Sequence, residues 1–150
     1  MLSHLHDLIK DKEILILGFG REGRSTLNRI LEVGDAAGIT IADGNEALTL
    51  PDAMEITTLS GEKKSVSTEG ISLLTGAHYM DSLENYDVIF KSPGVVLPKA
   101  ADDYTCLITS QTEVFFEAYR EQIIGITGTK GKSTTSTLLY HILRKSGMDT

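Results

Sequence analysis

Residues 14–23 are Ile-Leu-Ile-Leu-Gly-Phe-Gly-Arg-Glu-Gly, four apolar residues followed by the pattern G-x-G-x-x-G. A continuous apolar run of this kind is typical of a parallel strand that is buried on both faces. The glycines allow a tight turn, the close approach of a diphosphate to the backbone, and the packing of a following helix on the strand. The segment therefore predicts a strand, a glycine turn and a helix.

The next segment completes a βαβ unit. Apolar residues recur at helical spacing over residues 27–31, and Gly34 provides an end for the helix. Residues 39–42 predict a second strand that ends in Asp43, which follows Gly23 by 20 residues. An acid at this position can accept hydrogen bonds from the ribose or base of a nucleotide. The alternative is an ordinary crossover without a ligand, and the motif does not separate a nicotinamide cofactor from another diphosphate nucleotide.

Helix and strand signals continue to alternate further along the chain. A short helix is predicted at residues 2–9, and Ser110 with Glu113 forms a capping box for a later helix. Further strands are predicted at residues 55–59, 87–90 and 106–108, and the polar residues 61–70 are predicted to form a mobile loop. The order predicts an α/β fold, a Rossmann-like parallel sheet flanked by helices.

The predicted strand at residues 87–90 is followed by Ser92-Pro93-Gly94. Such a turn at the carboxyl end of a strand lies where open parallel sheets bind ligands. On its own, the same sequence is more often only a turn.

A second glycine motif follows in residues 122–134, Gln-Ile-Ile-Gly-Ile-Thr-Gly-Thr-Lys-Gly-Lys-Ser-Thr. The segment predicts a strand at 123–127, a phosphate loop and a helix, although Ile126 stands where the strict Walker pattern has its first glycine. The loop N–H groups and the helix N-terminus would face one anion. Lys132 would reach the β- and γ-phosphates and Ser133 would hold Mg²⁺. The alternative is a glycine-rich turn that binds nothing.

Composition limits the class of protein. The chain has 150 residues, 41% hydrophobic and 23% charged, as in a soluble globular protein. No apolar run approaches the ~20 residues of a membrane span, and the first residues lack a signal-peptide pattern. The single cysteine, Cys106, indicates a reducing cytoplasm. A net charge of −7 without a basic cluster beyond the phosphate loop argues against nucleic-acid binding.

A Rossmann-like unit followed by a phosphate loop resembles the Mur ligases, the ATP-dependent amide-forming enzymes of peptidoglycan synthesis. In that family an N-terminal domain holds a UDP-sugar and a central domain with the loop Gly-Thr-Asn-Gly-Lys-Ser/Thr holds ATP; here Lys130 replaces the usual Asn. The resemblance implies a UDP-sugar-binding domain at residues 1–121 and the truncated start of the ATP-binding domain at residues 122–150. We therefore expect an N-terminal piece of a longer ligase that is inactive by itself.

Within this family, residues 18–23 together with Ser92-Pro93-Gly94 are most similar to the members that add D-glutamate. The resemblance implies UDP-N-acetylmuramoyl-L-alanine, D-glutamate and ATP as substrates, Mg²⁺ as cofactor, and an acyl-phosphate intermediate. Lys132 is the implied catalytic residue. The implied ATP-binding residues are Gly128, Thr129, Lys130, Gly131, Lys132, Ser133 and Thr134, with Ser133 as the metal ligand. The implied UDP-substrate residues are Gly18, Gly20, Arg21, Glu22, Gly23, Asp43, Gly44, Asn45, Ser92, Pro93 and Gly94.

Three of these residues depart from the family pattern. Arg21 and Glu22 stand where an apolar residue and Thr are common, and Asn45 stands where Arg is often found against uracil. Diphosphate contacts at the first glycine turn would therefore come mainly from backbone amides, with help from Arg21.

Two other functions stay open. One is a non-catalytic dinucleotide-sensing module that binds NAD, which would not need the phosphate loop. The other is a different Mur ligase, such as the muramate:alanine ligase.

Residues 122–150 also pose a packing problem. Leu138, Leu139, Ile142 and Leu143 form an apolar stripe, and one strand with one helix cannot form a core. We expect the segment to dock on the first domain or to pair with a second copy as a dimer.

Overall fold

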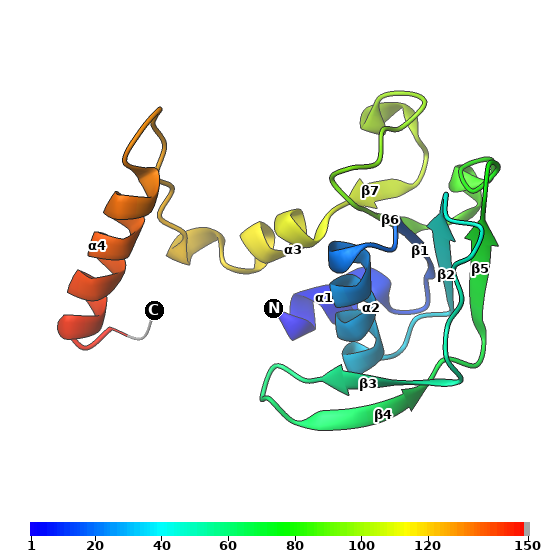
Figure 1. Ribbon diagram of the computed structural model, residues 1–150, viewed down its shortest axis with the longest axis horizontal. Helices are drawn as coiled ribbons and strands as arrows, with labels where there is room; N and C mark the ends of the chain where they lie inside the picture. The colour runs from blue at the N-terminus through cyan, green and yellow to red at the C-terminus, as the bar shows by residue number, and fades with distance from the viewer. Residues whose placement is uncertain (149–150) are drawn as a thin grey trace. The chain divides into compact units, whose positions relative to one another are not determined.

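The computed structural model describes residues 1–148 and divides the chain into two compact units. The first unit is Met1–Tyr119, and the second begins at Arg120. Each is described by itself (Figure 1). None of the helices in residues 1–148 is both long and apolar enough to cross a lipid bilayer.

The first unit is built on a five-stranded sheet with the order β5-β2-β1-β6-β7. All four neighbouring pairs are parallel, which confirms the predicted α/β Rossmann-like fold. The strands are β1 (Glu13–Leu17), β2 (Gly38–Asp43), β5 (Ile71–Thr75), β6 (Val88–Lys91) and β7 (Leu107–Thr109). The central strand β1 is buried from Ile14 onward, as its apolar run predicts. The carboxyl ends of β1, β2 and β6 therefore share one edge of the sheet.

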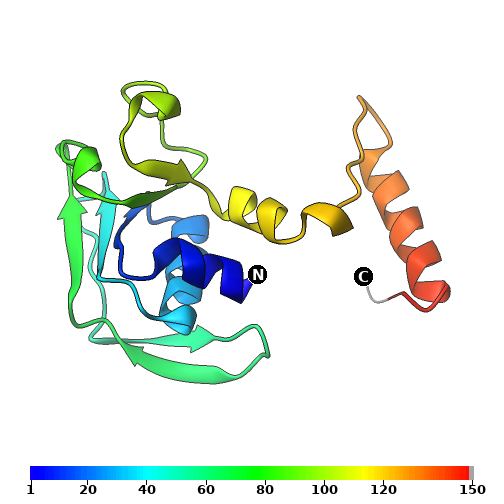
Figure 2. The same ribbon diagram turned by 180° about the vertical axis from the view of Figure 1, so that it is seen from behind.

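Three helices cover one face of this sheet: α1 (Leu2–Ile9), α2 (Arg21–Val33) and α3 (Gln111–Ala118). Their buried side chains form one core with the sheet residues Ile14, Ile16, Ile41, Val88 and Phe90. Figure 2 shows the three helices together on this side. Ser110 is confirmed as the predicted N-cap of α3, because the Glu113 amide donates to Ser110 Oγ at 3.2 Å, which is one of the two hydrogen bonds of a capping box.

Irregular chain and the short 3-10 helix η1 (Leu83–Asn85) cover the other face, whereas the 3-10 helix η2 (Ala101–Asp103) is exposed. Leu15, Leu17 and Ile89 are fully buried there. Cys106 packs at the margin of this cluster as a small apolar residue, and burial raises the pKa of its thiol.

An antiparallel hairpin takes the place of a crossover helix between β2 and β5. It consists of β3 (Ala53–Thr57) and β4 (Lys63–Ser67). The strand predicted at residues 55–59 is confirmed as β3, which begins and ends two residues earlier and belongs to the hairpin, not to the five-stranded sheet. The predicted loop at 61–70 was wrong, because residues 63–67 form β4. Ile56 is the only fully buried residue of the hairpin strands, so the alternation that signals a strand is missing from β4.

Polar contacts attach the hairpin to α2. The Arg29 guanidinium donates to the Thr57 carbonyl at 2.7 Å, and Glu32 Oε1 accepts from the Leu59 amide at 2.8 Å. Arg29 and Glu32 also form an ion pair in which their side chains are only 18% and 10% exposed. The hairpin is thus fixed to the same helix that begins at the glycine turn.

The second unit contains the 3-10 helix η3 (Arg120–Gln122) and the helix α4 (Lys132–Lys145). The predicted strand at 123–127 was wrong, because these residues form no strand and Ile124 is 62% exposed. A strand needs a neighbour to satisfy its backbone hydrogen bonds, and this unit has none among the described residues. On α4, Leu138 and Ile142 are exposed and Leu139 and Leu143 are half-buried.

Candidate functional site

The first glycine turn connects β1 to α2. Gly18 has a φ of +89°, and a Cβ there would lie 2.9 Å from both Ser92 Cβ and Val95 Cγ2. A Cβ on Gly23 would lie 2.1 Å from the Gly18 carbonyl oxygen. The structure therefore requires glycine at positions 18 and 23, for the turn and for the packing of the helix on it.

Gly20 differs from these two glycines. It precedes the first residue of α2 in an extended conformation that any residue adopts, and a Cβ there would meet no atom within 4 Å. No side chain of the described residues caps this helix end. The first amides of α2 therefore remain available to an anion in the open space beside Gly20.

The carboxylate of Asp43 connects the loop after β1 to the loop after β2, at the edge of the sheet where the strands end. Its Oδ2 accepts from the Phe19 amide at 2.6 Å, and its Oδ1 accepts from the Asn45 amide at 2.9 Å. Asp43 thus lies beside the glycine turn, as the G-x-G-x-x-G pattern with an acid 20 residues later predicts. Its oxygens keep further lone pairs for a ligand, and its contact with ribose or base stays a prediction.

The turn after β6 lies against Gly18. Ser92 Oγ donates to the Gly18 carbonyl at 2.9 Å, and the Ser92 amide donates to the Leu17 carbonyl at 2.9 Å. Pro93 and Gly94 are exposed, and a Cβ on Gly94 would meet no atom within 4 Å. Three predicted groups, at residues 18–23, 43–45 and 92–94, are therefore brought to one edge of the sheet.

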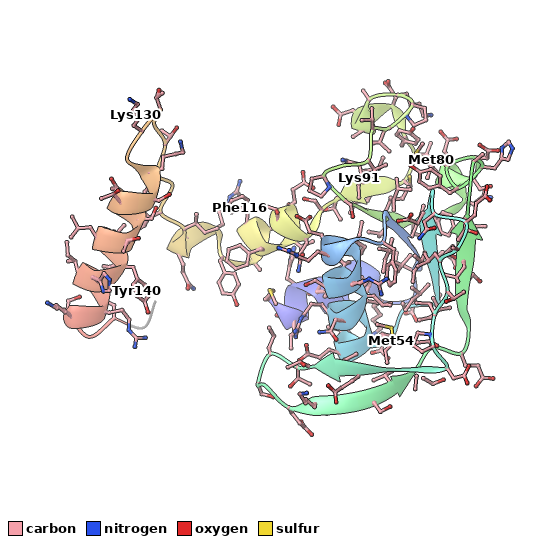
Figure 3. The ribbon with its side chains drawn as sticks, viewed as in Figure 1. Met54, Met80, Lys91, Phe116, Lys130 and Tyr140 are labelled. Atoms are coloured by element: carbon pink, nitrogen blue, oxygen red, sulfur yellow. The ribbon has the colours of Figure 1, made fainter. Side chains whose placement is uncertain are left out.

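Sequence reasoning missed two residues at this edge, Lys91 and Tyr79. Lys91 lies at the end of β6 (Figure 3) and is half-buried. Its Nζ donates to the carbonyls of Ser92 at 3.2 Å and Val95 at 3.0 Å. Its place at the end of an apolar strand was a usable signal. Tyr79 is half-buried, and its Cε1 would be 3.6 Å from a Cβ on Gly44. The sequence around Tyr79 carries no motif that would have singled it out.

The second glycine motif forms a loop at the start of α4. Gly131 has a φ of +81° and precedes the helix, and Gly128 has a φ of +149°. Lys132 Nζ donates to the Gly128 carbonyl at 2.6 Å, so the lysine is folded onto its own loop. Residues 128–134, including Thr129, Lys130, Ser133 and Thr134, are all exposed. The predicted ATP-binding residues lie together in one loop, but they are all exposed and do not pack against a buried core.

Metal ligands are scarce in the described part of the chain. Within residues 1–148, no group of three His, Cys, Asp or Glu side chains is placed to hold a metal ion. A metal at the phosphate loop would depend on the exposed hydroxyl of Ser133 and on oxygens from a ligand.

Comparison with curated proteins gives the family. The chain is 32% identical over 152 residues to the UDP-N-acetylmuramoylalanine–D-glutamate ligase of Clostridium botulinum (strain Hall), and the match covers 99% of the chain. The chain belongs to the Mur ligase family. The enzymes of the same name from Clostridium novyi and Ligilactobacillus salivarius are 33% and 31% identical. No protein-family model matches the chain.

The match includes both glycine motifs but only part of each relative. The chain spans 31% of the length of the two clostridial enzymes and 28% of the Ligilactobacillus enzyme. The resemblance recognised in residues 18–23, 92–94 and 128–133 is confirmed.

Proposed function

We propose that the chain binds UDP-N-acetylmuramoyl-L-alanine at the carboxyl edge of β1, β2 and β6, as part of an ATP-dependent ligase that adds D-glutamate. The open space at Gly20 is the observation that carries this proposal. Neither the backbone conformation nor the surrounding protein requires glycine at that position. A ligand phosphate that approaches the uncapped end of α2 explains it, whereas an ordinary crossover does not.

The residues around this space have complementary roles in the proposal. The amides at the start of α2 and the side chain of Arg21 bind the diphosphate. Asp43, Gly44 and Asn45 face the ribose and uracil, and Gly94 closes the diphosphate from the opposite side. Glu22 is half-buried in the first turn of the helix, so backbone amides carry most of the diphosphate contact.

The phosphate loop supplies the ATP side of the reaction. Lys132 leaves the Gly128 carbonyl and contacts the β- and γ-phosphates. This neutralises charge as the substrate carboxylate takes the γ-phosphoryl group from ATP and ADP leaves. The amine of D-glutamate then attacks the acyl phosphate, and phosphate leaves as the amide forms. Ser133 would hold Mg²⁺, which when bound offsets the charge of the phosphate oxygens.

A thermal-shift comparison tests the substrate against the sensor alternative. A ligand at ~100 times its dissociation constant adds about 2.7 kcal/mol to the free energy of unfolding. We expect UDP-N-acetylmuramoyl-L-alanine to raise the melting temperature of the 150-residue chain and NAD to leave it unchanged. A shift with NAD alone would contradict the ligase proposal and favour the sensor. UDP-N-acetylmuramate, which lacks the alanine, is the control for the muramate:alanine ligase.

A further inference from the structure

We propose that Lys91 binds the diphosphate of the nucleotide substrate through its ammonium group, while it also holds the turn that follows β6. This inference rests on the proposed function, because it adds a binding residue to the same site. Lys91 belongs to neither glycine motif.

The backbone of Lys91 lies beside the start of the glycine turn. It is the last residue of β6 and pairs in register with Leu17, the last residue of β1. The two residues that hold its ammonium, Ser92 and Val95, are also the ones whose side chains would meet a Cβ on Gly18. The cation is therefore attached to the loop that touches the proposed diphosphate site.

The charge of Lys91 has no anionic partner in the described structure. Across residues 1–148, no carboxylate oxygen lies within 4.0 Å of its Nζ, whereas Lys63, Lys64 and Lys99 each pair with a glutamate. Asp43, the acid of the proposed site, is directed to the amides of Phe19 and Asn45 instead. A half-buried cation held on the loop that contacts Gly18 attracts an anion, and a diphosphate is the anion that the glycine turn is shaped to receive.

The hydrogen-bonding capacity of the ammonium allows both roles. A lysine ammonium has three N–H donors, and two of them are occupied by the carbonyls of Ser92 and Val95. The third donor remains for a phosphate oxygen. Because the two carbonyls already restrict the long side chain, binding loses less conformational entropy than it would with an exposed lysine.

The test compares a ligand that has the diphosphate with one that lacks it. Dissociation constants of UDP and of uridine are measured by NMR titration of the 150-residue chain and its variants. Lys91→Met keeps an apolar stem and removes the charge, and Lys91→Arg keeps the charge. Lys99→Met is the matched control, because it removes an exposed lysine that pairs with Glu84. We expect Lys91→Met to weaken UDP about tenfold and uridine less than twofold. Lys91→Arg and Lys99→Met should keep UDP within about threefold of the parent chain.

Two results would overturn the proposal while the proposed function stands. If the parent chain and Lys91→Met bind UDP equally well, the ammonium does not contact the diphosphate. If Lys91→Met weakens UDP and uridine by the same factor, Lys91 only supports the turn. A parent chain that binds neither ligand would instead refute the proposed nucleotide site itself, and the inference with it.

Discussion

Replacing Gly20 with leucine tests whether the open space at the start of α2 belongs to a ligand. The residue is extended, and no atom lies within 4 Å of the position of a Cβ. We therefore expect the free energy of unfolding to fall by no more than about 1 kcal/mol, the cost of leucine in place of glycine at a helix N-cap. The leucine side chain would occupy the space in which the diphosphate meets the helix amides. Affinity for UDP-N-acetylmuramoyl-L-alanine should fall at least tenfold, which is about 1.4 kcal/mol.

The neighbouring glycines provide the opposite case. Gly18→Ala would place a Cβ 2.9 Å from Ser92 and Val95 at a φ of +89°. Backbone strain and overpacking together should lower the free energy of unfolding by about 2–5 kcal/mol. Loss of binding in that variant would therefore follow from damage to the fold, whereas in Gly20→Leu it would follow from steric exclusion.

Urea denaturation and calorimetric titration of the same samples separate these effects. Gly125→Leu is the matched control, since Gly125 has no atom within 4 Å of its Cβ position, no positive φ, and a place outside the proposed UDP site. If Gly20→Leu unfolds like the parent chain and still binds the UDP substrate with unchanged affinity, the reasoning is refuted. The turn would then have only a structural role.

Three further predictions follow from other parts of the chain. Arg29→Met should lower the free energy of unfolding by about 3 kcal/mol in urea, because it leaves the poorly exposed Glu32 carboxylate unpaired; an unchanged midpoint would show that the ion pair contributes nothing. The chain should release no phosphate with ATP, Mg²⁺ and both other substrates; release that requires D-glutamate and disappears in Lys132→Ala would contradict this. Sedimentation should show a dimer for the whole chain and a monomer for a version ending at Arg120; a monomeric whole chain with exchange-protected amides in residues 122–148 would mean internal docking.

The sequence was sufficient to predict the strands at the centre of the sheet. The run at β1 is apolar at every position after Glu13, and the glycines beside it have steric roles that few other residues can fill. The sequence was insufficient to predict the strand β5 at the edge of the sheet. In β5, Ile71 and Leu73 are only half-buried, and the polar hairpin before them hides the start of the strand. A strand whose burial depends on a single neighbour leaves a weak pattern in its own residues.

The site could be predicted in its positions but not in its contacts. Ser92 and Gly18 are 74 residues apart. The rule that the carboxyl ends of parallel strands share one edge of the sheet places both residues there, but it does not state that the Ser92 hydroxyl donates to the Gly18 carbonyl. The same rule places Asp43 correctly but does not show that its oxygens accept from the amides of Phe19 and Asn45. Lys91 was missed because a lysine at the end of a strand is ordinarily interpreted as the start of a solvated loop.

The second unit shows the physical origin of this limit. Backbone hydrogen bonds in a helix join residues i and i−4, so α4 forms from local sequence alone. A strand at residues 123–127 would depend on partners elsewhere, and its apolar residues cannot supply them. Without that strand the phosphate loop has a helix on one side only, and Lys132 bonds to the loop itself. Residue identity thus specifies a phosphate-binding motif, whereas an organised phosphate site also needs the sheet on which such a loop is normally mounted.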